Sequence, residues 1–98
     1  MKEKVEELRK ILSNANLSRL SDKSNNYKYQ LFYDVELIQL TEGDENTIEF
    51  DNLKQAIEVF SIVSESNFIS YIKGEIKKKA KILDIDLDKK IFIKIHIS

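Results

Sequence analysis

The segment from Tyr27 to Val63 decides the fold, and it reads YKYQLFYDVELIQLTEGDENTIEFDNLKQAIEVFSIV. Its first part alternates in polarity with the two-residue period of a half-buried strand. The apolar positions are Tyr27, Tyr29, Leu31, Tyr33, Val35 and Leu37. We therefore expect a strand whose odd-numbered side chains face the core.

A tight turn is predicted at Gly43-Asp44, because a type II′ hairpin prefers glycine at its first central position. This turn would fold residues 27–50 into a β-hairpin, in whose register Leu37 faces Phe50. The same register brings the apolar side chains of the second strand onto the core face of the first. We therefore expect two directly paired strands with one apolar face.

Two helices are predicted between residues 51 and 83, because apolar residues recur there at three- and four-residue intervals. Asp51 is expected to cap the first helix, and Ser66 or Asn67 the second. The first apolar stripe consists of Leu53, Ala56, Ile57, Phe60 and Val63. The second consists of Ile69, Ile72, Ile76, Ala80 and Leu83. The second helix should stop at Asp84, which takes the left-handed conformation usually held by glycine.

An amphipathic helix is also predicted near the N-terminus, within a helical segment of residues 1–20. Its narrow apolar stripe consists of Val5, Leu8, Leu12 and Ala15. This stripe fits either a helix laid on the sheet or a short seam that joins two copies into a homodimer. The polar run of residues 21–26 is typical of a linker to the first strand.

The chain ends in a predicted strand, residues 91–98, in which four isoleucines alternate with other residues. The predicted hairpin needs a third strand, since an isolated strand pair is marginal in water. Together the elements predict a single α+β domain of residues 1–98 with the order α-β-β-α-α-β. Its architecture would be a two-layer sandwich, in which helices cover a small, mainly antiparallel sheet of about three strands. The position and direction of the last strand stay open.

The composition fits one small domain, with 98 residues of which 42% are hydrophobic and 34% charged. The absence of cysteine excludes a disulfide framework, a thiolate metal site and a cysteine nucleophile. The first residues mix charges where a signal peptide needs an apolar run, and no stretch approaches the ~18 apolar residues of a membrane span. We therefore expect a cytoplasmic protein that does not enter a membrane.

The net charge of −1 hides a difference between the two ends of the chain. Residues 1–66 hold 8 Lys and Arg against 13 Asp and Glu, whereas residues 67–98 hold 8 against 4. The surface of this small acidic protein is therefore expected to be dipolar.

No pattern in the sequence indicates a catalytic or metal site. Aspartates at positions 84, 86 and 88 resemble the start of a calcium loop, but an EF-hand would need glycine and glutamate where the chain has Lys89 and Ile95. His96 is the only histidine, and no serine lies in a Gly-x-Ser-x-Gly elbow. Two glycines leave no phosphate-binding loop. We therefore expect no catalytic, cofactor-binding or metal-binding residues and no enzyme activity.

The first candidate binding surface, the acidic hairpin, belongs to the segment around the predicted turn. It comprises Asp34, Glu36, Glu42, Asp44, Glu45 and Glu49. In the predicted register these carboxylates lie on the non-core face or at the tip of the hairpin. They fit either protection of the sheet edge against unwanted pairing or docking on a basic partner.

The second candidate, the basic helix, belongs to the helix that ends near Leu83. It comprises Lys73, Lys77, Lys78 and Lys81, which share one sector at ~100° per residue. These lysines fit a solvated helix face, a contact with a phosphate backbone or a contact with an acidic protein. Gly74 in the same sector marks a close backbone approach or a kink, or has no structural role.

No motif assigns the chain to a family. In size, charge and lack of cysteine it is similar to small inhibitors encoded by phages or mobile elements, such as anti-CRISPR proteins. This likeness implies a non-enzymatic protein that inhibits or modulates a larger protein or nucleoprotein complex, with the acidic hairpin as the first choice of contact. The alternatives are an accessory protein that binds nucleic acid through the basic helix, and an immunity or antitoxin partner.

Overall fold

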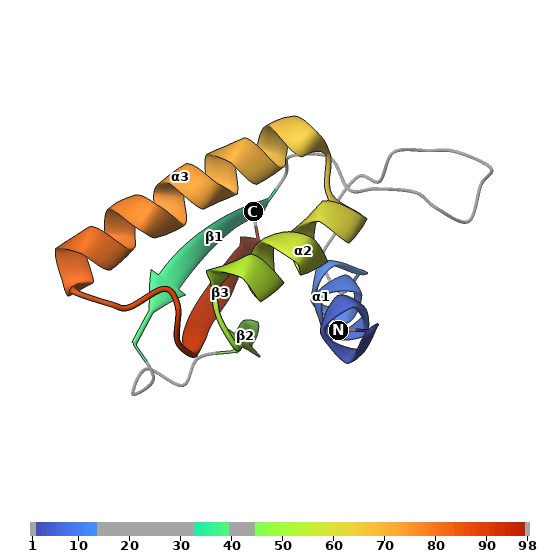
Figure 1. Cartoon of the computed structure of the whole chain (residues 1–98). Helices are drawn as coiled ribbons and strands as arrows, with labels where there is room; N and C mark the ends of the chain where they lie inside the picture. The colour runs from blue at the N-terminus through green and yellow to red at the C-terminus, as the bar shows by residue number, and fades with distance from the viewer. Residues whose placement is uncertain (1, 14–32, 40–44, 98) are drawn as a thin grey trace.

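Three helices and three strands make up the parts of the chain that the computed structural model describes, which are residues 2–13, 33–39 and 45–97 (Figure 1). Along the chain they are α1 (Lys2–Ser13), β1 (Tyr33–Ile38), β2 (Thr47–Phe50), α2 (Leu53–Val63), α3 (Ser66–Leu83) and β3 (Ile91–Ile97). This order confirms the predicted α+β class and its succession α-β-β-α-α-β. None of these three helices has the length and apolar character needed to cross a membrane.

The sheet is antiparallel, and β3 is its middle strand. β1 pairs with one edge of β3 and β2 with the other. Leu37 and Ile48 lie opposite Ile93 from the two sides, which places three apolar side chains in one row. The middle position suits β3, because its core-facing side chains Ile91, Ile93 and Ile95 are at most 1% exposed.

The predicted β-hairpin is wrong, because β3 lies between its two strands. Leu37 faces Ile93 rather than Phe50, and β1 and β2 run parallel to each other. The predicted core faces of both strands are nevertheless confirmed by burial. Alternation determines which face a side chain takes, but any strand can supply the backbone hydrogen bonds alongside. Residues 27–32 and the turn residues 43–44 lie outside the described residues.

The helices form the second layer on one face of the sheet (Figure 1). α3 lies along β1, whereas α1 and α2 lie toward β2. The largest fully buried side chains come from both layers and include Phe50, Phe60, Leu8, Leu12, Leu37, Ile72, Ile76 and Ile93. Burial of each such side chain contributes roughly 1.5–3 kcal/mol, so this shared core is what holds helices and sheet together.

α1 buries its apolar stripe inside the protomer. Val5, Leu8 and Leu12 are 9%, 0% and 0% exposed, and the helix packs against α2 and β2. A homodimer seam would need this same stripe on the surface. The burial therefore favours the prediction of a helix laid on the sheet, while Ala15 and the linker residues 21–26 lie outside the described residues.

α3 buries Ile72, Ile76 and Ala80 of its predicted stripe, but its first turn differs from the prediction. Phe68 is 3% exposed, whereas the predicted Ile69 is only partly buried. The ring of Phe68 meets the ring of Tyr33 edge to face, with centroids 4.7 Å apart. The hydroxyl of Tyr33 also shares a hydrogen bond with Ser64, the buried residue between α2 and α3. These contacts with β1 place Phe68 rather than Ile69 in the core, and residue spacing alone cannot choose between two adjacent apolar positions.

The N-cap of α2 is Asn52 rather than the predicted Asp51. Asn52 Oδ1 accepts a hydrogen bond from the backbone N–H of Gln55 at 2.8 Å. In return, the side chain of Gln55 accepts from the backbone N–H of Asp51 at 2.7 Å. Both residues thus serve the helix start, because an N-terminal turn leaves several N–H groups without partners.

The ends of α3 match the prediction at one end only. The helix begins after Glu65, whose backbone carbonyl accepts from two N–H groups of the first turn, so neither Ser66 nor Asn67 is the cap. Asp84 ends the helix in the left-handed conformation, with φ 57° and ψ 49°. This stop is confirmed, because aspartate tolerates that conformation better than most non-glycine residues.

Candidate functional site

The acidic hairpin residues are divided between the two edge strands of the sheet. Asp34 and Glu36 lie on β1 and Glu49 lies on β2, on the face opposite the helix layer. β3 runs between them, and its Lys94 occupies the same cross-strand row as Glu36. The structure therefore separates the carboxylates that the predicted hairpin would have brought together.

The carboxylate of Glu36 contacts two basic side chains from different elements. Lys79 Nζ on α3 lies 3.1 Å from Oε2, and His96 Nε2 on β3 lies 2.7 Å from Oε1. The hydrogen bond with His96, followed by the one with Lys79, lowers the pKa of Glu36. Glu36 thus joins β1 to both of its neighbouring elements as an ionised group.

The other two carboxylates also have partners within the protein. Asp34 Oδ1 accepts hydrogen bonds from the hydroxyl of Tyr71 at 3.0 Å and from the backbone N–H of Val35 at 2.8 Å. The first of these bonds raises the pKa of Tyr71. Glu49 Oε2 lies 3.3 Å from Lys90 Nζ. Much of the negative charge on the strands is therefore already matched by groups of the chain itself.

Of the other three acidic hairpin residues, the structure describes only Glu45. Glu45 is exposed just before β2, while Glu42 and Asp44 lie outside the described residues. Within residues 2–13, 33–39 and 45–97, no three His, Asp or Glu side chains are arranged to hold a metal ion. The pairs of Glu36 with Lys79 and His96 therefore link β1 to α3 and to β3.

The four lysines of the basic helix are all exposed on α3. Their neighbour Lys79 is half-buried and pairs with Glu36, so it does not belong to this surface. Among the described residues, no carboxylate lies within ion-pair distance of Lys73, Lys77, Lys78 or Lys81. Lys73, Lys77 and Lys81 recur every four residues and therefore form a row along one side of the helix.

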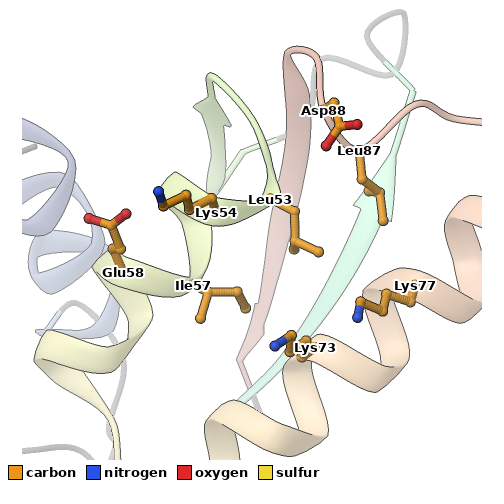
Figure 2. Close-up of a pocket in the computed structure, with 8 residues that line it drawn as sticks. All are labelled: Leu53, Lys54, Ile57, Glu58, Lys73, Lys77, Leu87 and Asp88. Carbon is orange, nitrogen blue, oxygen red and sulfur yellow. The ribbon is translucent and has the colours of Figure 1, made fainter.

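A groove with a volume of ≈ 460 Å³ lies beside this lysine row, between α2 and α3 (Figure 2). Its apolar floor comes from Leu53 and Ile57 on α2 and from Leu87 in the connection between α3 and β3. The charged residues at its rim are Lys54, Glu58, Lys73, Lys77 and Asp88. The groove therefore combines an aliphatic floor with a rim on which ammonium groups outnumber carboxylates.

A backbone hydrogen bond fixes one end of the groove. The N–H of Leu53 donates to the carbonyl of Leu87 at 2.9 Å. Leu53 is the first residue of α2, so its N–H has no acceptor within the helix. In the same connection Asp86 Oδ1 accepts from the backbone N–H of Asp88 at 2.9 Å. The position of Leu87 over the start of α2 is therefore determined by backbone contacts.

Sequence reasoning identified the lysines but missed the apolar half of the groove. Leu53 and Ile57 belong to the predicted core stripe, and Leu87 lies in a connection without helix or strand. All three side chains are only partly buried at the border of the core. The signal that could have indicated this border is the position of Leu53 and Ile57 next to the charged residues Lys54 and Glu58.

The two charged surfaces thus differ in how much of their charge can meet a partner. The carboxylates on β1 and β2 have partners within the chain, whereas the lysines of the basic helix have none among the described carboxylates. No family model, curated protein or solved structure matches the chain.

Proposed function

We propose that this chain is a non-enzymatic binding protein that modulates a larger protein or nucleoprotein complex by docking its basic helix on an acidic surface. The observation that carries the proposal is the exposed lysine row on α3, which has no ion-pair partner among the described residues. The class of function is the one expected from the sequence. The contact surface differs, because the carboxylates of Asp34, Glu36 and Glu49 have partners within the fold.

The cost of rearranging charges supports this choice of surface. Docking through Glu36 would compete with its contacts to Lys79 and His96. Docking through the basic helix breaks no such pair among the residues that the structure describes, so its ammonium groups are available to attract a partner. Unpaired charges at an interface mainly raise the association rate and select partners of opposite sign.

Nucleic acid remains the second candidate partner, because a lysine row with a four-residue repeat can follow a phosphate backbone. Two features favour a protein over a nucleic acid as the partner. Arginine occurs only twice in the chain, and the groove beside the row has an aliphatic floor with no aromatic side chain for base stacking. An aliphatic floor next to lysines suits a protein surface that carries both apolar and acidic side chains.

The test is affinity capture from the native host with three forms of the protein. They are the wild type, a triple Lys77→Glu, Lys78→Glu, Lys81→Glu variant, and a control with Lys2, Lys4 and Lys10→Glu on α1, which changes net charge by the same amount. Quantitative mass spectrometry should find a partner retained by the wild type and the control but lost by the triple variant. A fourth form carries Glu36→Lys with Glu45→Lys, and a partner lost by this form instead of the triple variant would overturn the choice of the basic helix. Loss of binding after nuclease treatment would identify nucleic acid as the partner.

A further inference from the structure

We infer that the groove between α2 and α3 binds an acidic amphipathic α-helix of a protein partner. The inference rests on the proposed function, because the basic helix forms one wall of this groove. Beyond the proposed function, the inference says which structural element of the acidic partner the groove recognises, namely an α-helix. Two separate features point to such a ligand: the floor requires apolar side chains, and the α3 wall requires carboxylates.

The floor is a preformed apolar strip. Leu53 and Ile57 lie one helical turn apart on α2, and the hydrogen bond from Leu53 to the Leu87 carbonyl holds the third side chain beside them. All three pack against the core, yet each keeps part of its surface exposed. A ligand that covers them removes apolar surface from water without first having to order the floor.

The α3 wall carries positive charge at helical spacing. Lys73 and Lys77 are one turn apart, which is about 6 Å along the axis of α3. Figure 2 shows both side chains extending from α3 toward the α2 side of the groove, where Ile57 lies. A ligand helix alongside α3 repeats its own side chains at i and i+4 with the same rise. Two carboxylates one turn apart can therefore meet both ammonium groups.

The remaining charges at the rim orient the ligand. Glu58 lies on α2 and Asp88 in the connection before β3, away from the α3 wall (Figure 2). These two carboxylates repel negative charge on their side, where Lys54 is the one described ammonium group at the rim. The side with Lys73 and Lys77 has two ammonium groups and, among the described residues, no carboxylate at the rim, so the ligand's acidic residues are expected along the flank that faces it. The apolar side chains of the ligand, at i, i+3, i+4 and i+7, then point to the floor.

The probe for this site is a fluorescein-labelled synthetic helix with leucines at i, i+3, i+4 and i+7 and glutamates along one flank of that stripe. Fluorescence anisotropy should give saturable binding to the full chain. One matched peptide has glutamine in place of glutamate, and another has serine in place of leucine. Each should bind at least about tenfold more weakly, because each lacks one of the two complementary features.

Variants of the protein test separately how much the lysine wall and the apolar floor contribute to binding of the peptide. Lys73→Gln with Lys77→Gln should weaken binding of the acidic peptide about tenfold, whereas Lys2→Gln with Lys10→Gln, the same charge change on α1, should not. Ile57→Ser should weaken binding to a similar extent while leaving its salt dependence unchanged. Because Ile57 is partly buried, Leu87→Ser is a second floor variant, and circular dichroism checks that each variant keeps its helices.

The outcomes distinguish this inference from the proposed function. If the Lys77, Lys78 and Lys81 triple variant loses the native partner while Ile57→Ser and Leu87→Ser keep it, the proposed function stands and the groove inference fails. Equal binding of the three peptides would also overturn the inference. So would displacement of the peptide by palmitate or by a single-stranded oligonucleotide at a lower concentration than unlabelled peptide, because the groove would then suit a different ligand class.

Discussion

Glu36 is the residue whose replacement tests the charge pairing on the open face of the sheet. Its carboxylate contacts Lys79 on α3 and His96 on β3, and its side chain is 38% exposed. Half-exposed pairs are screened by water and contribute roughly 0.2–1 kcal/mol each. Glu36→Gln should therefore lower the free energy of unfolding by about 0.5–1 kcal/mol at neutral pH, as measured by urea denaturation.

The same variant should show a pH dependence of defined sign. The groups that face Glu36 are Lys79, His96 and Lys94, and the first two lower its folded pKa below the ordinary value of 4.5. Its contribution is thus fully present above pH 4.5 and is lost as the pH falls through the folded pKa. Wild type and Glu36→Gln should differ at neutral pH and converge in strong acid. Lys78→Gln is the control, and equal stability of wild type and Glu36→Gln at neutral pH would contradict the pairing.

The helices and strands show which parts of the fold residue patterns can predict. Alternation identified the buried faces of β1 and β2, and the left-handed stop at Asp84 was predictable because aspartate is one of the few residues that tolerate it. In α3 the predicted Ile72, Ile76 and Ala80 are buried, but Phe68 takes the place of the predicted Ile69, since the contact between Phe68 and Tyr33 joins elements far apart in sequence. Patterns within an element therefore predict its type and faces, while contacts between elements decide which of two adjacent apolar residues is buried.

Gly74 gives a prediction for α3 as a helix. It is exposed in the helix interior, and a Cβ added there would meet no atom within 4 Å, which excludes the close backbone approach among the three alternatives for this glycine. Glycine in a helix interior costs roughly 0.5–1 kcal/mol relative to alanine. Gly74→Ala should raise the free energy of unfolding by about that amount in thermal denaturation. Glu75→Ala, which replaces one good helix former with another, should change it by less than about 0.5 kcal/mol; a destabilised Gly74→Ala would show that α3 needs glycine.

At the scale of the whole molecule, the class and order of elements were predictable, but the neighbours in the sheet were not. The isoleucines of β3 indicate a strand without saying whether it lies at the edge or in the middle. The candidate site likewise has one part that the sequence predicted and one part that it did not. Helical spacing predicted the lysine wall, whereas the groove needed the position of Leu87 relative to α2, which depends on a backbone hydrogen bond between distant segments.

Engineered disulfides test the sheet order directly, because the chain contains no cysteine. Asp34 and His96 are directly opposed across β1 and β3. Opposed residues have Cα atoms about 4.5–5.5 Å apart, which is within the range that a disulfide spans. Asp34→Cys with His96→Cys should therefore form a disulfide on mild oxidation, measured as loss of free thiols in the unfolded protein. The hairpin register would instead oppose Glu36 to Asp51, so oxidation of Glu36→Cys with Asp51→Cys, while the first pair stays reduced, would show that β1 and β2 are neighbours and that β3 is not the middle strand.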